Sequence, residues 1–412
     1  MDFNLCLGGN FMESLARRST AFIALVLAAL AAATVSAPPI SAAPAYPTPL
    51  PDPFFAAPAD IDSKAPGDVL ASRRQDTWLL PGHEVWQIKY RSTNSAGKPI
   101  PAVTTVIKPV NAPSDMPVLS YQVIVNSLGL RCAPSTGLMT GEISDVIGLP
   151  AALARGWAVA IPDHLGPTSA YGAARLGGMI TLDGVRAVKQ LPELRLSESP
   201  VALAGYSGGG LSTAWAAAMN STYAPDVELV GVAQGGVPAD IEEMALGLGQ
   251  MDRHPGFGLG FAAALGLERE YPDRLPISDQ LNQVGIALRD ELKDECVAMI
   301  FAKGQAYGAT EVTNSTSLLQ DETARGVMRE NSLVNYSRVP TAPVFMWQGV
   351  GDQLTPYGAV AATADRYCKA GASLMFRGYP IAEHMTTALV GLPEALQYLE
   401  DRFAGLPAPN NC

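Results

Sequence analysis

A serine flanked by glycines stands where an apolar run gives way to a helix-forming run. The pentapeptide Gly205–Gly209 (GYSGG) follows the β-prone residues Pro200–Ala204 and precedes the helix-forming residues Leu211–Met219. A serine in a sharp strand-to-helix turn needs small residues two positions before and after it, because the strained backbone there packs closely. The pattern predicts that Ser207 is a nucleophile, although a glycine turn without chemistry would share the bare motif.

A serine hydroxyl is a weak nucleophile unless a base removes its proton, so the prediction requires a histidine. On a strand–turn–helix scaffold the chain order is serine, acid, histidine. His384 is the histidine that lies late enough in the chain; His83, His164 and His254 are expected to be surface or packing residues. Asp163 and His164 precede Ser207, and we interpret them as a loop-fixing pair.

Asp352 is the expected acid. It ends the loop Gln348–Asp352 after the apolar run Val344–Trp347, where a strand end would bring a carboxylate to the histidine. A buried carboxylate in this place fixes the imidazole tautomer and stabilises the imidazolium. Asp365, in a helical stretch, and Glu383, adjacent to His384, are weaker candidates.

Acyl transfer also requires two N–H donors for the oxyanion. The N–H of Gly208, directly after the nucleophile, is the expected first donor. The second is expected from the loop Asn126–Arg131, with Asn126 as the candidate. Tyr206 is interpreted as a wall of the pocket.

These residues can meet only if strand ends share one edge of a sheet. The alternation of β-prone and helical runs after an initial hairpin predicts an α/β fold, a mostly parallel sheet with an antiparallel edge. The expected strands are Val85–Tyr90, Pro101–Val110, Val118–Val125, Trp157–Ile161, Val201–Ala204, Val344–Trp347 and Ser373–Tyr379, and the expected helices are Gly141–Arg155, Ile180–Gln190 and Pro393–Phe403.

The pattern changes between residues 240 and 332, which are helical without a convincing strand. We expect a helical cap inserted into a core formed by residues 61–239 and 333–412. Its expected helices are Ile241–Leu248, Gly258–Glu270, Ser278–Phe301 and Leu318–Met328. Apolar cap residues such as Met244, Leu246, Leu248, Phe257, Leu259 and Phe261 could line a lipid tunnel or pack a core.

Composition restricts the class of protein. The chain has 412 residues, of which 48% are hydrophobic and 16% charged, enough for one large domain with a buried core. Its 39 acidic against 28 basic residues give a net charge of -11, which argues against nucleic acid as a partner. No cofactor or metal is predicted.

The N-terminus has the pattern of an export signal. Arg17 and Arg18 precede the apolar run Ala21–Ala33, and Val35–Ala37 supplies small residues for cleavage. We expect a signal peptide over residues 1–37, a Pro/Ala-rich linker over residues 38–60, and a secreted protein. A membrane anchor is the alternative, but the run is short for a span, so no stable membrane span is expected in the mature protein.

The mature chain would keep four cysteines, Cys132, Cys296, Cys368 and Cys412. In an oxidising compartment two disulfides are expected, and the sequence alone allows three pairings. A zinc site is disfavoured because no two cysteines have the close spacing typical of metal ligands.

Longer stretches make a family resemblance specific. The chain resembles the secretory lipase family of fungi and actinobacteria over about residues 66–403. The stretches that carry the likeness are Trp86–Val110, Tyr121–Ser135, Gly156–Pro167 (GWAVAIPDHLGP), Ala204–Gly210 (AGYSGGG) and Gly349–Tyr357 (GVGDQLTPY).

The resemblance implies an α/β-hydrolase fold with a helical cap, and a triad of Ser207, Asp352 and His384 that hydrolyses acyl esters, often of lipids. It also implies a disulfide from Cys132 to Cys296 in the cap, and with it one from Cys368 to Cys412. The expected partners are a lipid or small ester substrate and, transiently, a lipid interface. Where the family carries an Asp-Ser pair in the oxyanion loop, this chain has Asn126-Ser127, so one charge is missing there.

Other functions share this machinery. The same triad could transfer an acyl group to another acceptor or cleave peptides, since fold and triad do not fix the acceptor. A non-catalytic binding protein on the same scaffold is a third possibility, but it has no need of a complete triad. The sequence does not specify the acyl chain length or the alcohol.

Overall fold

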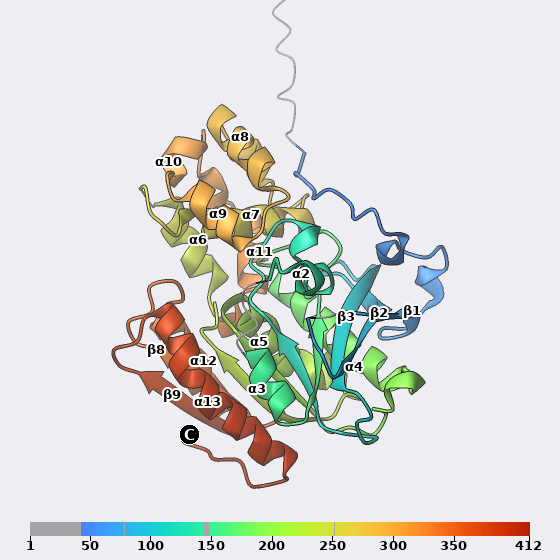
Figure 1. The fold of residues 1–412 in the computed structure, drawn as a ribbon. Coiled ribbons are helices and arrows are strands. Elements are labelled where there is room, and N and C mark those ends of the chain that lie inside the picture. The colour runs from blue at the N-terminus through green and yellow to red at the C-terminus, as the bar shows by residue number, and fades with distance from the viewer. Residues whose placement is uncertain (1–42, 78, 144–147, 251) are drawn as a thin grey trace, which may run out of the picture. The chain divides into compact units, whose positions relative to one another are not determined.

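The computed structural model describes residues 43–77, 79–143, 148–250 and 252–412, so the predicted signal peptide lies outside the described residues. The described residues form a nine-stranded sheet in the order β1-β2-β3-β5-β4-β6-β7-β8-β9 (Figure 1). The strands are β1 Val69–Gln75, β2 His83–Thr93, β3 Pro99–Pro109, β4 Val118–Gln122, β5 Ala158–Pro162, β6 Val201–Tyr206, β7 Leu229–Gly235, β8 Val344–Gly349 and β9 Leu374–Tyr379.

The sheet changes from antiparallel to parallel at β5. Strands β1, β2 and β3 pair antiparallel, as do β3 and β5, whereas every pair from β5 through β4 to β9 is parallel. The prediction of a mostly parallel sheet with an antiparallel edge is confirmed. The carboxyl ends of β4, β6 and β8 therefore meet at one edge, where ligands bind in open α/β sheets.

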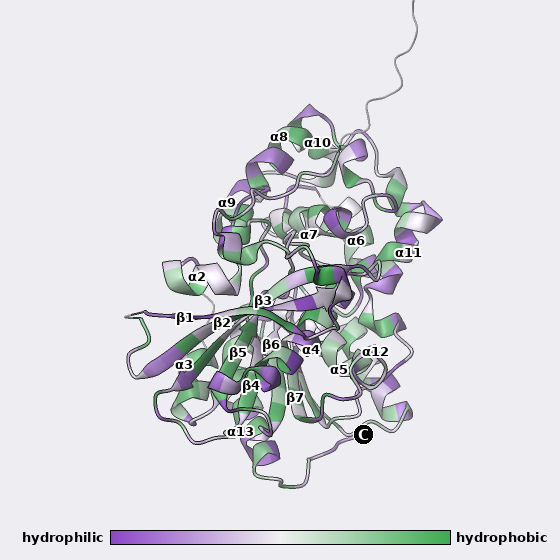
Figure 2. Ribbon diagram, turned by 90° about the vertical axis from the view of Figure 1, so that its right-hand side faces the viewer, coloured by the Kyte–Doolittle hydropathy of each residue, from purple (hydrophilic) through white to green (hydrophobic). Residues whose placement is uncertain are grey.

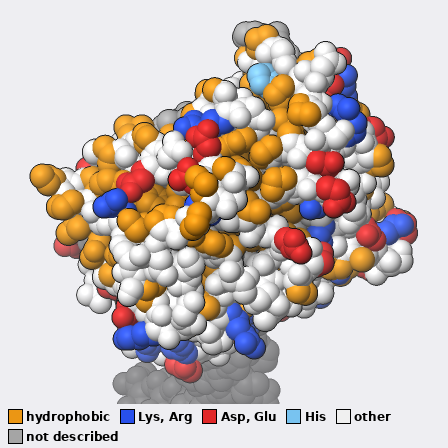
Figure 3. Space-filling model, turned by 90° about the horizontal axis from the view of Figure 1, so that it is seen from below, with side chains coloured by type: hydrophobic (Ala, Val, Ile, Leu, Met, Phe, Trp, Pro, Cys, Tyr) orange, Lys and Arg blue, Asp and Glu red, His pale blue; other side chains and the backbone are white. Residues whose placement is uncertain are grey.

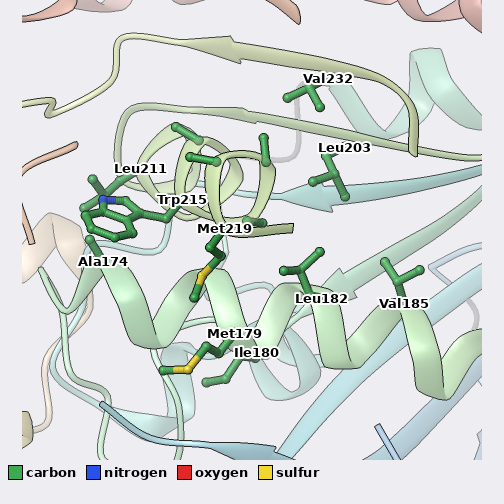
Figure 4. Close-up of a cluster of buried hydrophobic side chains, with 14 of the residues drawn as sticks. Ala174, Met179, Ile180, Leu182, Val185, Leu203, Leu211, Trp215, Met219 and Val232 are labelled. Atoms are coloured by element: carbon green, nitrogen blue, oxygen red, sulfur yellow. The ribbon is translucent and has the colours of Figure 1, made fainter. Parts of the chain in front are cut away.

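Helices cover both faces of the sheet. On one face, α4 (Ala174–Gln190), α5 (Ser207–Tyr223) and α12 (Tyr357–Lys369) pack in one buried cluster, and on the other lie α3 (Gly148–Ala154) and α13 (His384–Phe403). Figure 4 shows how Met179 and Leu182 of α4 and Trp215 and Met219 of α5 meet below Leu203 and Val232 of the sheet. This packing fixes α5, which begins at the candidate nucleophile.

Among the described residues, six α-helices lie between β7 and β8, at the position of the expected cap and above the sheet domain in Figure 1. They are α6 Ile241–Gly249, α7 Phe257–Glu270, α8 Gln283–Leu292, α9 Val297–Gly304, α10 Ala309–Val312 and α11 Glu322–Glu330. Figure 2 shows hydrophilic residues on the outer parts of these helices, and a separate apolar cluster with Phe257, Phe261 and Leu288 packs between them.

Some elements differ from the sequence expectation. Of the helix expected over Gly141–Arg155, the structure shows α3 from Gly148 to Ala154. A helix that was not expected, α2 (Pro134–Thr140), precedes it and ends at Gly141, which has a left-handed φ of 78°. The helix expected over Ser278–Phe301 is broken into α8 and α9, where Cys296 is the N-cap of α9. Strands β1 and β7 were not expected: β1 is a polar edge strand, and β7 (LVGVAQG) contains one glycine and ends in another.

The described part of the predicted linker, residues 43–60, lies against the rest of the protein and is here called the N-terminal segment. Thr48 donates two hydrogen bonds to the carboxylate of Asp294 in the cap, from its backbone N at 2.6 Å and its Oγ1 at 2.8 Å. Further along, Lys89 of β2 donates a 2.9 Å hydrogen bond to the carbonyl of Ala56. The segment thus contacts both the cap and the edge of the sheet. Among the described residues, no helix is long and apolar enough to cross a membrane.

Candidate active site

Ser207 occupies a strained turn between β6 and α5. Its φ is 55°, in the left-handed region that a residue with a side chain seldom adopts. Gly209 makes the turn possible, because a Cβ atom there would lie 1.9 Å from the carbonyl oxygen of Gln122 in β4. The strain exposes the hydroxyl above the sheet edge, as in a nucleophile elbow.

His384, the first residue of α13, contacts the hydroxyl of this serine. Its Nε2 lies 2.9 Å from Ser207 Oγ, and its Nδ1 lies 2.7 Å from Asp352 Oδ2. All three side chains are buried. With Asp352 accepting from Nδ1–H, Nε2 is free to take the proton of the hydroxyl. The structure therefore brings together the three residues that the sequence order had selected.

Asp352 lies in the loop after β8, where several donors hold its carboxylate. Gln348 Nε2 and Thr355 Oγ1 donate to Oδ2 at 2.9 and 2.8 Å, and the backbone N atoms of Leu354 and Thr355 donate to Oδ1 at 2.9 and 2.8 Å. Burial raises the pKa of Asp352, but hydrogen bonds and the charge of His384 outweigh burial, and the pKa lies below its ordinary value. The carboxylate thus stays ionised beside the imidazole.

The two candidate oxyanion donors, Gly208 and Asn126, lie close to each other beside Ser207. Gly208 is in the first turn of α5, where N–H groups have no partner within the helix. A Cβ atom at position 208 would lie 2.0 Å from Asn126 Oδ1, so the amide of Asn126 reaches directly over the start of α5. Asn126 has a φ of 42°, and its buried Oδ1 has no hydrogen-bond partner in the part of the chain that the structure describes.

A cavity of about 500 Å³ leads from this site into the cap. Ser207 and Asn126 lie on its wall, together with Leu354 and Thr355 of the acid loop. The cap supplies mainly apolar side chains, among them Met244, Leu248, Phe257, Leu259, Phe261 and Leu281. Of the cap residues singled out in the sequence, Leu246 does not line the cavity.

The model of the family described as "Secretory lipase" matches residues 134–411. This chain belongs to that family. The match includes Ser207, Asp352 and His384 but not Asn126, which lies before it. The resemblance to the secretory lipase family is confirmed.

Named relatives support this membership along most of the chain. Secreted triacylglycerol lipase LIP2 of Malassezia furfur is 31% identical over 412 residues, which cover 95% of this chain and 87% of that protein. The solved structure of Candida antarctica lipase A in its closed state has a TM-score of 0.81 at 31% identity, with 89% of each chain covered. The α/β-hydrolase fold and the enzyme class, a carboxylic ester hydrolase, follow from these similarities.

One relative is named as inactive. A Mycobacterium tuberculosis protein named "Probable inactive lipase" is 34% identical over 376 residues, covering 87% of this chain and 83% of that protein. This chain is thus about equally similar to a relative named as a lipase and to one named as inactive. Catalysis by a given member depends on its own triad and oxyanion hole.

Two disulfides brace this secretory lipase. Cys132 in the loop before α2 pairs with Cys296 in the cap, and Cys368 of α12 pairs with Cys412. These are the pairings that the resemblance implied. No group of His, Cys, Asp and Glu side chains among the described residues is arranged to hold a metal ion.

Several site residues were missed in the sequence because they act through contacts rather than motifs. Thr355 and Gln348 hold the acid, and Tyr206 donates a 2.6 Å hydrogen bond to the carbonyl oxygen of His384. Spacing offers a signal only for Thr355, three residues after the acid. A tyrosine between glycine and the nucleophile gives no hint of its partner.

The loop-fixing pair is divided in the structure. Asp163 accepts hydrogen bonds from the backbone N and Oγ of Ser135 at 2.8 and 2.5 Å, and burial raises the pKa of this carboxyl to about 7. His164 is fully buried apart from 1% of its surface, and burial lowers its pKa to about 4. The hydrogen bonds of Asp163 join it to Ser135 and not to Ser207, Asp352 or His384.

Proposed function

We propose that this secretory lipase hydrolyses lipid esters through an acyl-enzyme formed on Ser207. The observation that carries the proposal is the chain of contacts from Ser207 Oγ to His384 Nε2 at 2.9 Å and from His384 Nδ1 to Asp352 at 2.7 Å. In apo enzymes such contacts are often longer, so this site is pre-organised for proton transfer.

The proposed reaction has two halves. Ser207 Oγ attacks the ester carbonyl carbon while His384 Nε2 takes its proton, and the carbonyl oxygen becomes an oxyanion. The imidazolium then gives its proton to the departing alcohol, and the acyl group remains on Ser207. Water repeats the sequence in the second half, with His384 as base, and releases the carboxylic acid. Asp352 stays ionised and stabilises the imidazolium in both halves.

The oxyanion is proposed to bind at Gly208 and Asn126. The N–H of Gly208 is at the positive end of the α5 dipole, where a developing negative charge is stabilised. Asn126 lies opposite it and contributes its backbone N–H, with the side chain shaping the loop. Each such donor is worth about 100- to 1000-fold in rate.

The substrate is proposed to be an ester with a long acyl chain. The cavity from Ser207 into the cap is mainly apolar, which suits a hydrocarbon chain, and each methylene buried there contributes about 0.8 kcal/mol. The relative from Malassezia furfur is named a triacylglycerol lipase, so acylglycerols are the first substrates to test. Residues 240–332 are proposed to act as the cap that encloses the acyl chain.

Secretion is part of the proposal. The described residues contain two disulfides, which persist in oxidising compartments, and the family is described as secretory. A signal peptide over residues 1–37 would deliver the chain to such a compartment.

A lipid surface is the proposed setting of the reaction. Five large apolar side chains near the triad are exposed, and we call them the apolar face: Val350, Ile381, Met385, Leu389 and Val390. Ile381 is 97% exposed and lies three residues before His384. Figure 3 shows hydrophobic side chains gathered over part of the side of the molecule seen from below.

The test combines labelling with a substrate series. A fluorophosphonate should label the parent protein but not Ser207→Ala, and the variant should lose ester hydrolysis while keeping its melting temperature. Nitrophenyl esters of increasing chain length should then show rising kcat/KM. Labelling of Ser207→Ala would overturn the nucleophile, and preferential transfer of the acyl group to an added alcohol would make the enzyme an acyltransferase.

A further inference from the structure

Arg269, near the end of cap helix α7, is buried among backbone carbonyl groups. It is 4% exposed, and its guanidinium donates to the carbonyl oxygens of five residues. Nε donates to Ala45 at 2.9 Å, Nη1 to Leu128, Thr168 and Ser169 at 2.7, 3.0 and 3.1 Å, and Nη2 to Lys293 at 3.0 Å. The five N–H groups of a guanidinium form a rigid planar fork, so one side chain fixes several segments at once.

This guanidinium has no ion-pair partner among the described residues. Burial lowers the pKa of Arg269 to about 10, so the group remains charged at neutral pH. A buried cation without a carboxylate is costly unless its N–H groups are satisfied, and here carbonyl oxygens satisfy them. A position that only fills space would not need such a group.

One of these contacts reaches the oxyanion loop, which we define as residues 126–129. Leu128, whose carbonyl accepts from Arg269, lies two residues after Asn126. Ser169 Oγ in turn donates a 3.1 Å hydrogen bond to the carbonyl of Ser127. Arg269 therefore supports the loop directly at Leu128 and indirectly through Ser169.

The supported loop is strained. Asn126 has a φ of 42° and Ser169 a φ of 48°, and residues with side chains stay in this region only when their surroundings hold them there. The cap also binds the far end of the loop, since the N atoms of Leu128 and Gly129 donate to the carbonyl of Glu295 at 3.1 and 3.3 Å. Cap residues therefore bond both to the carbonyl oxygen of Leu128 and to the N–H groups of Leu128 and Gly129, in the segment that follows Asn126.

We infer that Arg269, acting with Ser169, is a positioning residue that keeps the oxyanion loop in the shape that aims its donor at the reacting carbonyl. The inference rests on the proposed function. It gives the cap a part in the chemical step, beyond enclosing the acyl chain. A donor displaced by about 1 Å can cost about 100-fold in rate, so the support of this loop matters as much as its sequence.

The test compares Arg269→Lys with a matched control. Lysine keeps the charge but cannot serve all five carbonyls, and we expect kcat to fall by about 10- to 100-fold with KM within about twofold. The loss should be equal for short and long esters, because the oxyanion is common to both. The control is Arg289→Gln, since Arg289 of α8 donates to the carbonyl of Ala43 in the N-terminal segment but not to the oxyanion loop. It should retain the parent kcat.

A readout independent of catalysis accompanies the kinetics. Amide hydrogen exchange in a peptide covering the oxyanion loop should be faster in Arg269→Lys than in the parent and unchanged in Arg289→Gln. Unchanged exchange in Arg269→Lys would overturn the inference whatever the rate of catalysis. An increase in KM confined to long esters would also overturn it, because the side chain would then shape the acyl cavity. Absence of Ser207-dependent hydrolysis in the parent would instead overturn the proposed function.

A second variant carries the test if Arg269→Lys does not fold. Ser169→Gly removes the hydroxyl that bonds to Ser127 and tolerates the positive φ, so the fold should survive. We expect a roughly 3- to 10-fold loss of kcat, the effect of one hydrogen bond of about 1 kcal/mol, with faster exchange in the loop peptide. Parent values of both quantities would contradict the inference.

Discussion

The hydroxyl of Tyr206 donates a 2.6 Å hydrogen bond to the carbonyl oxygen of His384, so the residue before the nucleophile holds the residue that supplies the base. Their rings also pack, with centroids 5.1 Å apart. Burial raises the pKa of Tyr206 well above its ordinary value, so the hydroxyl remains a donor. Tyr206 thus links β6 to the start of α13, a role beyond the pocket wall expected from the sequence.

Tyr206→Phe should keep the ring packing and lose the hydrogen bond to the carbonyl oxygen of His384. We expect kcat to fall by roughly 5-fold, equivalent to about 1 kcal/mol, because the base becomes less well fixed. Steady-state kinetics on a short soluble ester would measure this, with KM as the internal control. A raised KM at constant kcat would mean that Tyr206 instead contacts the substrate.

Asn126→Gly separates the backbone of Asn126 from its side chain. Glycine tolerates the φ of 42° and keeps the N–H, so most activity should remain if the backbone is the donor. A loss of about 100-fold in kcat would show that the side-chain amide is the donor. Asn126→Asp would place a carboxylate beside the oxyanion, and its pH–rate profile should shift toward acid as that group protonates.

His164 should make the protein less stable in acid. Its folded pKa of about 4 lies below the value of about 6.5 in an unfolded chain, so between these values only the unfolded state binds the proton. The contribution of neutral His164 to the free energy of unfolding is fully present above about pH 6.5. Up to about 3 kcal/mol of it is lost as the pH falls to about 4. His164→Phe should remove this part of the pH dependence in urea unfolding. Parallel curves for the parent and the variant would contradict it.

The two disulfides should differ in their effect on catalysis. The pair Cys132 and Cys296, separated by 164 residues, adjoins the oxyanion loop, whereas Cys368 and Cys412 are separated by 44 residues and lie on α12 and the C-terminus. Replacing either pair with alanine should cost about 4 to 5 kcal/mol of stability. Only loss of Cys132–Cys296 should also lower kcat at a temperature where both variants are folded. Equal kcat values in the two variants would show that the Cys132–Cys296 disulfide does not affect the oxyanion loop.

The apolar face should matter only at a lipid surface. Ile381→Ser together with Leu389→Ser should reduce hydrolysis of emulsified triacylglycerol by about 10-fold, because less apolar area leaves water on adsorption. Activity on a dissolved short ester should stay at the parent level. Val284→Ser, at an exposed apolar residue of α8, is the control. An equal loss in the control would remove the special role of the face.

The triad was accessible from the sequence because its chemistry imposes an order and a local context. Ser207 needs glycines around it, and His384 and Asp352 must follow it after later strands. The parallel sheet followed from short apolar runs such as Val344–Trp347 of β8, which alternate with helical runs. In both cases a local sequence pattern was sufficient for the prediction.

Other features arise only in three dimensions. The break between α8 and α9 occurs where Glu295 and Cys296 turn toward the oxyanion loop, and no helix-breaking residue marks it. Arg269 has the spacing of an ordinary solvent-facing arginine on a helix, yet its partners are as far away in sequence as Ala45. A contact that depends on the packing of four segments leaves no periodic signal in any one of them.

The bond from Arg269 to Ala45 also sets an order of events in biosynthesis. The two residues are 224 positions apart, so at about 5–20 residues per second the arginine is made roughly 10 to 50 s after its partner. A nascent chain that lacks the cap cannot fix the N-terminal segment or the strained loop at Asn126. Such a chain would contain Ser207 before it contains the cap residues that hold this loop, and Asp352 and His384 would follow only after the cap is complete.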